Sequence, residues 1–381
     1  MPFMARDVKV DTNTDELGKE IIQLFEQYFS INELTPKVHF ELEGCVTFNS
    51  NQSRLDYETI NSELSALGIL GELKDEYWQN QWEYVSKFVN QTPSKEASDL
   101  DFVIKQLPGM MKKYGVSHTH IKPVVWAGDK GQLASGSKNI FTKNVRDVHI
   151  PNAVQINVSA QDSNGNNLIA NTKLGEFLQQ RMLQTSYDCC LLFLPEEEAF
   201  SRIELKTKYG LDQELCSPTD ISGGHQGSIA LYRTHGKHNQ KMGESALILD
   251  SSQRVLVSQY NWQETARVEH RLGASSMLYD AYANTIFALA NLADALELFM
   301  RSKELGADFE KLELPTSLYC LSESEGAISL FENESWFANK INRVHAEVKQ
   351  TDKKSWQHLP DNVGQIYKSQ ILERYLTKIL Y

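Results

Sequence analysis

The sequence lacks the features that mark secreted, membrane-spanning and zinc-binding proteins. Its five cysteines are an odd number in 381 residues and show no C-x-x-C spacing, so neither a disulfide framework nor a cysteine-based zinc site is indicated. The N-terminus has no charged-then-apolar secretory signal, and the longest apolar run, Cys189 to Leu194, is too short to cross a bilayer. We therefore expect a cytoplasmic protein that makes no membrane contact.

Basic residues are in deficit as well. The chain has 38 Lys and Arg residues against 50 Asp and Glu residues, which gives a net charge of −12 with neutral histidines. Binding to nucleic acid draws most of its affinity from basic patches, so nucleic acid is not expected as a partner. An anionic substrate would instead need a local cluster of arginines, or metal ions held by some of the surplus carboxylates.

The chain also lacks internal repeats, low-complexity segments and a linker rich in Pro, Gly or Ser. Its hydrophobic fraction of 41% is typical of folded proteins. Residues 11–30 follow the periodicity of an amphipathic helix, and Asp280 is placed to cap a second, long helix. These patterns predict one compact α+β domain preceded by a short helical appendage.

Four segments far apart in the sequence alternate apolar with polar residues, as strands do when one face is buried. Their polar positions hold Glu41, Glu43, Glu83, Gln155, Asn157, Glu269 and Arg271. If the strands share one sheet, these side chains line one cavity. Neighbouring carboxylates repel one another unless cations neutralise them, and their oxygens suit Mg²⁺ or Mn²⁺. Any single alternation fits a solvated sheet face equally well, so the argument depends on their occurring together.

The order of these motifs resembles the catalytic domain of the glutamine synthetase family. The segment HFELEG, with Glu41 and Glu43, is similar to the family's E-x-E strand, and Asp75 precedes Glu83 by the spacing of its second acid pair. The segment QINVS, residues 155–159, stands where the family has H-x-H and a nearby serine, and RVEHR, residues 267–271, resembles its R-[IV]-E-x-R strand. The resemblance covers the chain from about residue 36 to its end.

This resemblance implies an α+β fold in which helices line a curved antiparallel sheet, of the glutamine synthetase and guanido kinase type. It divides the chain into an N-terminal helical appendage, residues 1–36, and a catalytic domain, residues 37–381. It also implies that ATP and Mg²⁺ (or Mn²⁺) are cofactors. In the family, the carboxylate of an amino acid attacks the γ-phosphate of ATP, and an amine then displaces phosphate from the acyl phosphate.

The resemblance also assigns roles to individual residues. The implied metal ligands are Glu41, Glu43, Asp75, Glu83 and Glu269. The implied catalytic residues are Arg271, which would neutralise the transferring phosphoryl group, and Arg202, which would clamp a substrate carboxylate. The implied nucleotide-binding residues are Arg233, Gln155, Asn157 and Ser159.

Several departures from the family pattern affect the expected activity. Gln155 and Asn157 replace two histidines, and an uncharged amide is a weaker metal ligand. Lys208 stands where the family has the glutamate that deprotonates ammonium, and its positive charge would repel ammonium. Only about 36 residues precede the first metal strand, so we expect no ring-shaped dodecamer, while a homo-oligomer stays open.

The sequence therefore predicts a ligase that activates a glutamate-like carboxylate with ATP and Mg²⁺ and joins it to an amine other than ammonia. The polar segment Gly128 to Asp147 is expected to form a mobile loop that helps to select the amine. Two alternatives remain at this point. One is a degraded homologue that binds a nucleotide or a partner protein without turnover, and the other is a small-molecule phosphotransferase.

Overall fold

The computed structural model describes residues 12–49, 54–78, 80–87, 91–126, 149–209, 228–233, 248–249, 255–256, 264–301, 312–322, 324–352 and 354–376. The segment Gly128 to Asp147, to which we assign amine selection, lies outside these residues. The side chain of Lys208 is also outside the description, because only the backbone of that helical turn is described.

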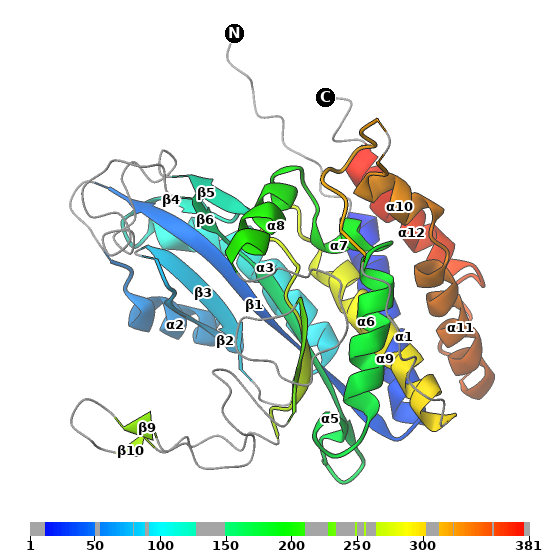
Figure 1. Ribbon diagram of the computed structural model, residues 1–381. Helices are drawn as coiled ribbons and strands as arrows, with labels where there is room; N and C mark the ends of the chain where they lie inside the picture. Colours follow the sequence, from blue (N-terminus) through cyan, green and yellow to red (C-terminus); the bar gives the residue numbers. More distant parts are fainter. Residues whose placement is uncertain are drawn as a thin grey trace.

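A seven-stranded antiparallel sheet forms the centre of the molecule (Figure 1). Its strands follow the order β2, β3, β1, β7, β11, β8, and β4 pairs with the far end of β1. Their bounds are β1 Leu34–Phe48, β2 Gly71–Asp75, β3 Gln81–Ser86, β4 Val116–His120, β7 Val154–Asp162, β8 Ile229–Tyr232 and β11 Arg267–His270. Two small hairpins pair β5 Val124–Trp126 with β6 His149–Pro151, and β9 Ile248–Leu249 with β10 Val255–Leu256.

The helices supply the rest of the described fold. Their bounds are α1 Thr12–Ile31, α2 Tyr57–Ala66, α3 Pro93–Lys112, α5 Leu168–Asn171, α6 Leu174–Ser186, α7 Cys190–Phe193, α8 Glu198–Tyr209, α9 Ala281–Met300, α10 Ala327–Asn333, α11 Trp336–Thr351 and α12 Val363–Leu376. None of these described helices is long and apolar enough to cross a membrane. The predicted α+β class, an antiparallel sheet lined by helices, is confirmed.

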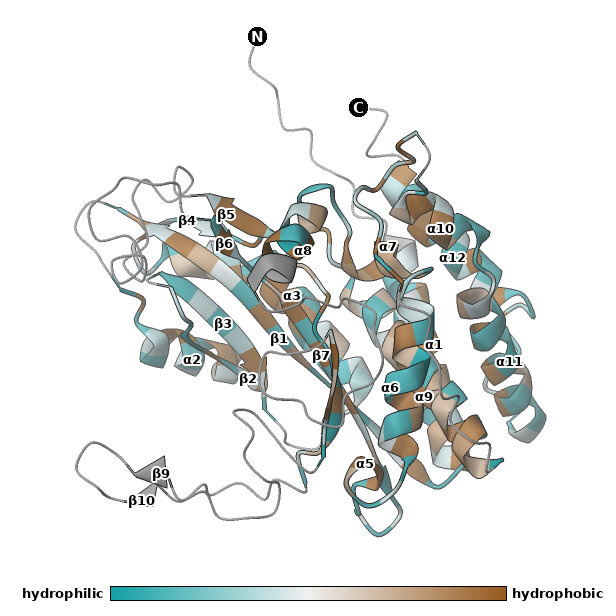
Figure 2. Ribbon diagram, in the orientation of Figure 1, coloured by the Kyte–Doolittle hydropathy of each residue, from teal (hydrophilic) through white to brown (hydrophobic). Residues whose placement is uncertain are grey.

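One face of the sheet is apolar and carries the main core. Val38, Phe40 and Leu42 of β1 stand opposite Val158, Ile156 and Val154 of β7 in the strand register, and all six side chains are buried. Helices α1, α3 and α9 contact these two strands, α6 contacts β8 and β11, and together the four helices cover this face. Figure 2 shows the alternation as hydrophilic and hydrophobic bands along β1 and β3. Because side chains alternate between the two faces of a strand, the residues between these apolar positions lie on the opposite, polar face.

The long helix α9 is apolar on nearly its whole circumference, because it packs between the sheet and other helices. Asp280 caps its N-terminus, as the sequence predicts, by accepting a hydrogen bond from the backbone nitrogen of Ala283 at 2.9 Å. Helix α1 packs against α9 and α11 and contributes the core side chains Ile21, Ile22, Leu24, Phe25, Tyr28 and Phe29. The division of the chain at residue 36 stays a prediction.

Some predicted elements differ from the observed ones at their ends. The alternation in the sequence predicts a first strand over Val38 to Phe48, whereas β1 begins at Leu34. The apolar pattern predicts one helix near Leu174 to Leu194, and the structure divides it into α6 and α7. The chain leaves the α-helical path between Ser186 and Cys190, although the apolar pattern continues. Hydrophobic periodicity reports burial, and it does not detect such a break when both parts are buried.

Candidate functional site

The polar face of the sheet gathers most of the predicted site residues. Glu43 of β1 pairs in register with Glu83 of β3, and Glu41 pairs with Gln155 of β7. On the next strand, Glu269 of β11 pairs with Asn157. All six side chains are buried, with exposed fractions between 0% and 7%. The structure therefore brings four carboxylates and two amides from four strands onto one buried surface.

The carboxylates at the β1–β3 end of this face repel one another. Burial, followed by the charge of Glu41, raises the pKa of Glu83 to about 8, and Glu43 adds a smaller contribution in the same direction. The ammonium group of Lys74, on β2, lies 2.8 Å from Glu83 Oε2 and opposes the shift. A protein cation is thus the immediate partner of this carboxylate, whose pKa is raised.

Two arginines neutralise the carboxylate at the other end of the face. Glu269 accepts from Arg267 Nη2 at 3.0 Å and from Arg271 Nη1 at 2.5 Å. Arg267 and Glu269 lie on β11, and Arg271 directly follows this strand. Because alternate residues of a strand point to the same side, the sequence R-V-E-H-R places both guanidinium groups beside one carboxylate. Both partners are charged, which makes these hydrogen bonds stronger than neutral ones.

The two amides that replace histidines connect these charged groups. Asn157 Oδ1 accepts from Arg267 Nε at 2.5 Å, and Asn157 Nδ2 donates to Glu41 Oε1 at 3.3 Å. Gln155 Oε1 accepts from Arg271 Nη1 at 3.3 Å. An amide offers an acceptor and a donor at once, and at Asn157 this lets one side chain join a guanidinium group to a carboxylate.

Arg202 reaches the same region from α8. Its side chain is 2% exposed, and its two terminal nitrogens donate to the backbone oxygens of Leu272 and Arg271 at 3.1 and 3.3 Å. Burial lowers its pKa to about 10, while Glu43 acts in the opposite direction. The guanidinium group remains charged at neutral pH and is held by backbone oxygens beside the polar face.

A lysine extends this face beyond Asn157. Lys37 of β1 pairs in register with Ser159 of β7, and its side chain is 7% exposed. Burial lowers its pKa. Within the described residues, no hydrogen bond or ion pair joins Lys37 to another side chain, so its positive charge is available to an anionic ligand near Ser159.

Two predicted site residues are not brought to this surface. Asp75 pairs in register with Trp82, which places it on the opposite side of the strand from Lys74, and it binds the exposed Arg54 at 2.6 Å. Arg233 follows β8 and forms an ion pair with Glu176 in the first turn of α6. The expected roles of these two residues, metal binding for Asp75 and phosphate binding for Arg233, find no support in their positions.

Three cationic residues of the site do not appear among the predicted site residues: Lys37, Lys74 and Arg267. The alternation of β1 and β11 contained the signal for Lys37 and Arg267, because Arg267 lies two residues and Lys37 four residues from an acidic position of the same strand, which places each on the face of that acid. The position of Lys74 depends on how β2 is aligned with β3, and one strand's own pattern does not contain that alignment.

The described residues do not fit a resident pair of divalent metal ions. Among them, no group of three or more His, Cys, Asp or Glu side chains is arranged to hold a metal. Asp75 lies away from the polar face and is paired with Arg54. Lys74 forms an ion pair with Glu83, and Arg267 and Arg271 form ion pairs with Glu269. The charges that metal ions were expected to neutralise are balanced largely by cations of the protein itself.

Comparison with known proteins supports the fold. No family model and no curated protein matches the chain by sequence. Among solved structures, one described as a novel glutamine synthase homolog shares 14% identity over 92% of this chain and 74% of its own, with a TM-score of 0.55. A structure of GmaS without ligand shares 10% identity over 89% of this chain and 73% of its own, with a TM-score of 0.53. A GmaS complex with ADP shares 12% identity over 95% of this chain and 78% of its own, with a TM-score of 0.51.

The molecule thus has a glutamine synthetase-type fold with a buried polar face of carboxylates, amides and guanidinium groups. The fold predicted from the order of its motifs is confirmed, and it is that of glutamine synthetase homologues. Sequence identities of 10–14% establish the fold alone. One fold can support many reactions, so the side chains of the site determine the chemistry of this chain.

Proposed function

We propose that this chain is an ATP-dependent carboxylate–amine ligase whose substrates bind along the polar face of the sheet. The observation that carries the proposal is the buried group of guanidinium side chains, Arg202, Arg267 and Arg271, directly beside the carboxylates. Guanidinium groups bind the oxygen pairs of carboxylate and phosphate, which are the two reacting groups of such a ligase. The GmaS structure with the same fold binds ADP, which supports a nucleotide as one ligand.

The proposed reaction has two steps. An oxygen of the substrate carboxylate attacks the γ-phosphorus of ATP, and ADP leaves with the electrons of the broken P–O bond. The amine nitrogen then attacks the acyl carbon, inorganic phosphate leaves, and a buried carboxylate accepts the proton that the nitrogen loses. Magnesium enters this scheme only with the nucleotide substrate.

The arginines of this chain would assist both steps. Arg271, at the centre of the face, would neutralise negative charge on the transferring phosphoryl group, and Arg202 would hold the substrate carboxylate. Lys37 and Ser159 would meet a further anionic group of the nucleotide, since they lie on the same face beyond Asn157. Burial strengthens each of these contacts, because water is excluded from the face.

We propose an amine other than ammonia as the second substrate. The proposal depends on the sequence, in which Lys208 replaces the family's ammonium-deprotonating glutamate. The carboxylate substrate is proposed to be glutamate-like, and cellular location in the cytoplasm is proposed from the lack of disulfide patterning and of a secretory signal.

A second function, nucleotide binding without turnover, is favoured by a different observation. Arg267 and Arg271 already satisfy Glu269, and Lys74 already satisfies Glu83, so the face is electrostatically balanced before any ligand arrives. Such a balance suits a site that binds and holds a ligand, because catalysis requires some groups to act only in the transition state.

Product analysis by mass spectrometry separates these functions. The protein is incubated with ATP, Mg²⁺, glutamate and a panel of primary amines, and the organic products are identified. An amide product supports the ligase, and a stable phosphorylated acid without amide would indicate a phosphotransferase. Saturable binding of an ATP analogue with no product in any mixture would support the binding protein and contradict the ligase.

A further inference from the structure

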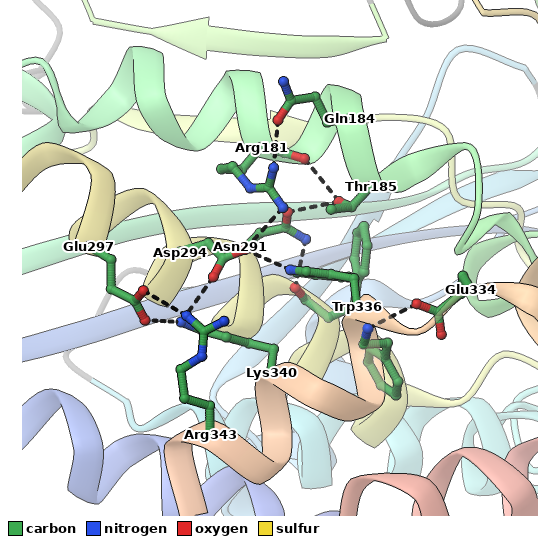
Figure 3. Close-up of polar contacts among 12 residues, drawn as sticks. Arg181, Gln184, Thr185, Asn291, Asp294, Glu297, Glu334, Trp336, Lys340 and Arg343 are labelled. Atoms are coloured by element: carbon green, nitrogen blue, oxygen red, sulfur yellow. Dashed lines mark hydrogen bonds and ion pairs between the residues drawn. The ribbon is translucent and has the colours of Figure 1, made fainter. Parts of the chain in front are cut away.

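A second charged site lies on the helical side of the molecule, apart from the polar face of the sheet. Helices α6, α9 and α11 enclose a pocket of about 220 Å³ that is lined by Arg181, Asp294, Glu297, Leu298, Arg301 and Arg343. Figure 3 shows Arg181 of α6, Asp294 and Glu297 of α9, and Lys340 and Arg343 of α11 converging. None of these residues takes part in the function proposed above.

The two carboxylates of this pocket have their acceptor positions filled. Asp294 accepts from Arg181 at 3.0 Å, from the indole nitrogen of Trp336 at 2.6 Å and from Lys340 at 2.9 Å. Glu297 accepts from Lys340 and, at 3.0 Å, from Arg343, while Arg301 lies 3.9 Å away. These contacts hold the acids in place, and Lys340, which is 1% exposed, is fixed between them.

Positive charge exceeds negative charge at this place. Among the described residues that line the pocket, together with Lys340, the four cations Arg181, Arg301, Lys340 and Arg343 share the two carboxylates, an excess of two positive charges. The whole chain carries a net charge of −12, so a local excess of this sign runs against its average. Concentrated positive charge in a partly enclosed pocket attracts anions.

The arginines also keep donors that no described residue uses. Arg181 Nε is buried and has no hydrogen-bond partner among the described residues, although both of its terminal nitrogens are bonded. Of the five N–H groups of Arg343, one donates a hydrogen bond to Glu297, and Arg301 approaches Glu297 only at ion-pair distance. The side chains of Arg343 and Arg301 are 55% and 64% exposed, so a ligand can reach them from solvent.

We propose that this pocket, defined here as the α6–α9–α11 pocket, binds a small multivalent oxyanion such as phosphate or a compact polycarboxylate. The excess of two charges matches a divalent anion, and the unused guanidinium donors match its oxygens. The volume of about 220 Å³ lies below the roughly 300 Å³ at which pockets for drug-sized ligands begin, which favours a small anion. A bound anion would join three helices that pack behind the sheet.

The test measures thermal unfolding while inorganic phosphate or citrate replaces chloride at constant ionic strength. The pocket predicts a saturable rise in Tm, because a ligand of the native state stabilises it by mass action. In the double variant Arg301→Gln/Arg343→Gln, the half-saturation concentration should rise about tenfold or more, since two of the binding charges are lost. The buried contacts of Asp294 with Arg181 and Lys340 remain in this variant, so its fold should be retained.

A matched control and a mapping experiment assign the effect to the pocket. Arg54→Gln removes an exposed arginine that is bound to Asp75 elsewhere on the molecule, and it should leave the phosphate response unchanged. Phosphate should also protect Arg301 and Arg343, but not Arg54, from modification by phenylglyoxal, as mapped by peptide mass spectrometry. The stronger of the phosphate and citrate responses identifies the class of anion. An equal response in wild type and double variant, or a Tm that follows ionic strength alone, would overturn the proposal.

Discussion

The last two residues of β11 and the residue that follows them occupy two very different environments. Glu269 and Arg271 lie on the polar face, whereas His270 points to the core, where its ring centroid lies 4.6 Å from that of Phe193 and 5.8 Å from that of Phe287. Burial lowers the pKa of His270 to about 3. The imidazole is therefore neutral at physiological pH, and its Nε2 is paired with Ser186 Oγ at 3.1 Å.

This depressed pKa makes stability depend on pH. The unfolded chain takes up a proton on His270 below its ordinary pKa of about 6.5, while the folded chain does so only near pH 3, so stability falls as the pH decreases through 6.5. At pH 5.5 the loss from this residue is about 1.4 kcal/mol. Urea unfolding at pH 7.5 and 5.5 should show a smaller difference for His270→Phe than for wild type. Equal differences would show that His270 does not govern this range.

The residues of the site could be predicted only in part, for a definable reason. Alternation along one strand fixes which of its side chains share a face, and it correctly grouped Glu41 with Glu43 and Glu269 with Arg271. Which residue faces Glu83 depends on the alignment of β2 with β3, and that alignment selects Lys74 and turns Asp75 away. Sequence spacing contains no information on this choice, because a shift of one residue reverses the face.

At the scale of elements, close helix packing depends on glycine at one position. A methyl group at Gly364 of α12 would lie 2.1 Å from the backbone oxygen of Ala338 in α11, so the two helices would have to separate. We expect Gly364→Ala to reduce the free energy of unfolding by about 2 kcal/mol. Denaturant unfolding measures this change.

Gly109 of α3 provides the matched control. A methyl group there would meet no atom within 4 Å, so Gly109→Ala should stabilise the protein by up to about 1 kcal/mol through helix propensity alone. The packing account would be wrong if both variants were stabilised to the same extent.

Helix ends show which element signals were readable in the sequence. The sequence pattern predicts a helix over Ser98 to Tyr114, whereas α3 starts at Pro93. It starts earlier because Thr92 Oγ1 accepts from the backbone nitrogen of Lys95 at 3.2 Å and proline occupies the first helical position. The T-P pair that encodes this start is visible in the sequence. The break between α6 and α7 has no such signal, since burial of both parts preserves the apolar pattern.

At the scale of the whole molecule, one arginine joins the two ends of the described chain. Arg374 of α12 donates to Asp15 of α1 at 2.7 Å and to Asp280, the N-cap of α9, at 2.5 Å. Asp280 is buried, so its charge depends on this partner. The contact connects the N-terminal helix, the central helix and the C-terminal helix in one network.

Removal of this arginine should be costly. We expect Arg374→Leu to lower the free energy of unfolding by about 3 kcal/mol, because it leaves buried Asp280 without its ion-pair partner. The exposed pair of Lys349 and Asp361 offers a comparison, and Lys349→Leu should change stability by less than about 1 kcal/mol. Equal effects of the two substitutions would mean that the network contributes nothing beyond a surface contact.

The fold as a whole was predictable because its evidence is distributed along the chain. Each motif is short, yet their order matched the strands that the sheet later brought together, from Glu41 to Arg271. The balance of charge on the polar face was predictable only in part, since Arg267 shares a strand with Glu269, whereas Lys74 reaches Glu83 from the neighbouring strand β2. The central claim is that this charge-balanced polar face supports the ligase reaction.

The most direct test is the rate of phosphate release from ATP and Mg²⁺ with glutamate, measured with and without each member of an amine panel. The ligase proposal predicts that at least one amine other than ammonium accelerates phosphate release. It also predicts that Arg271→Lys, which keeps the charge but loses the bidentate geometry, reduces this accelerated rate by about 10²-fold, the effect typical of losing one transition-state contact. Phosphate release that stays at the rate without enzyme for every amine, while the ATP analogue still binds, would contradict it.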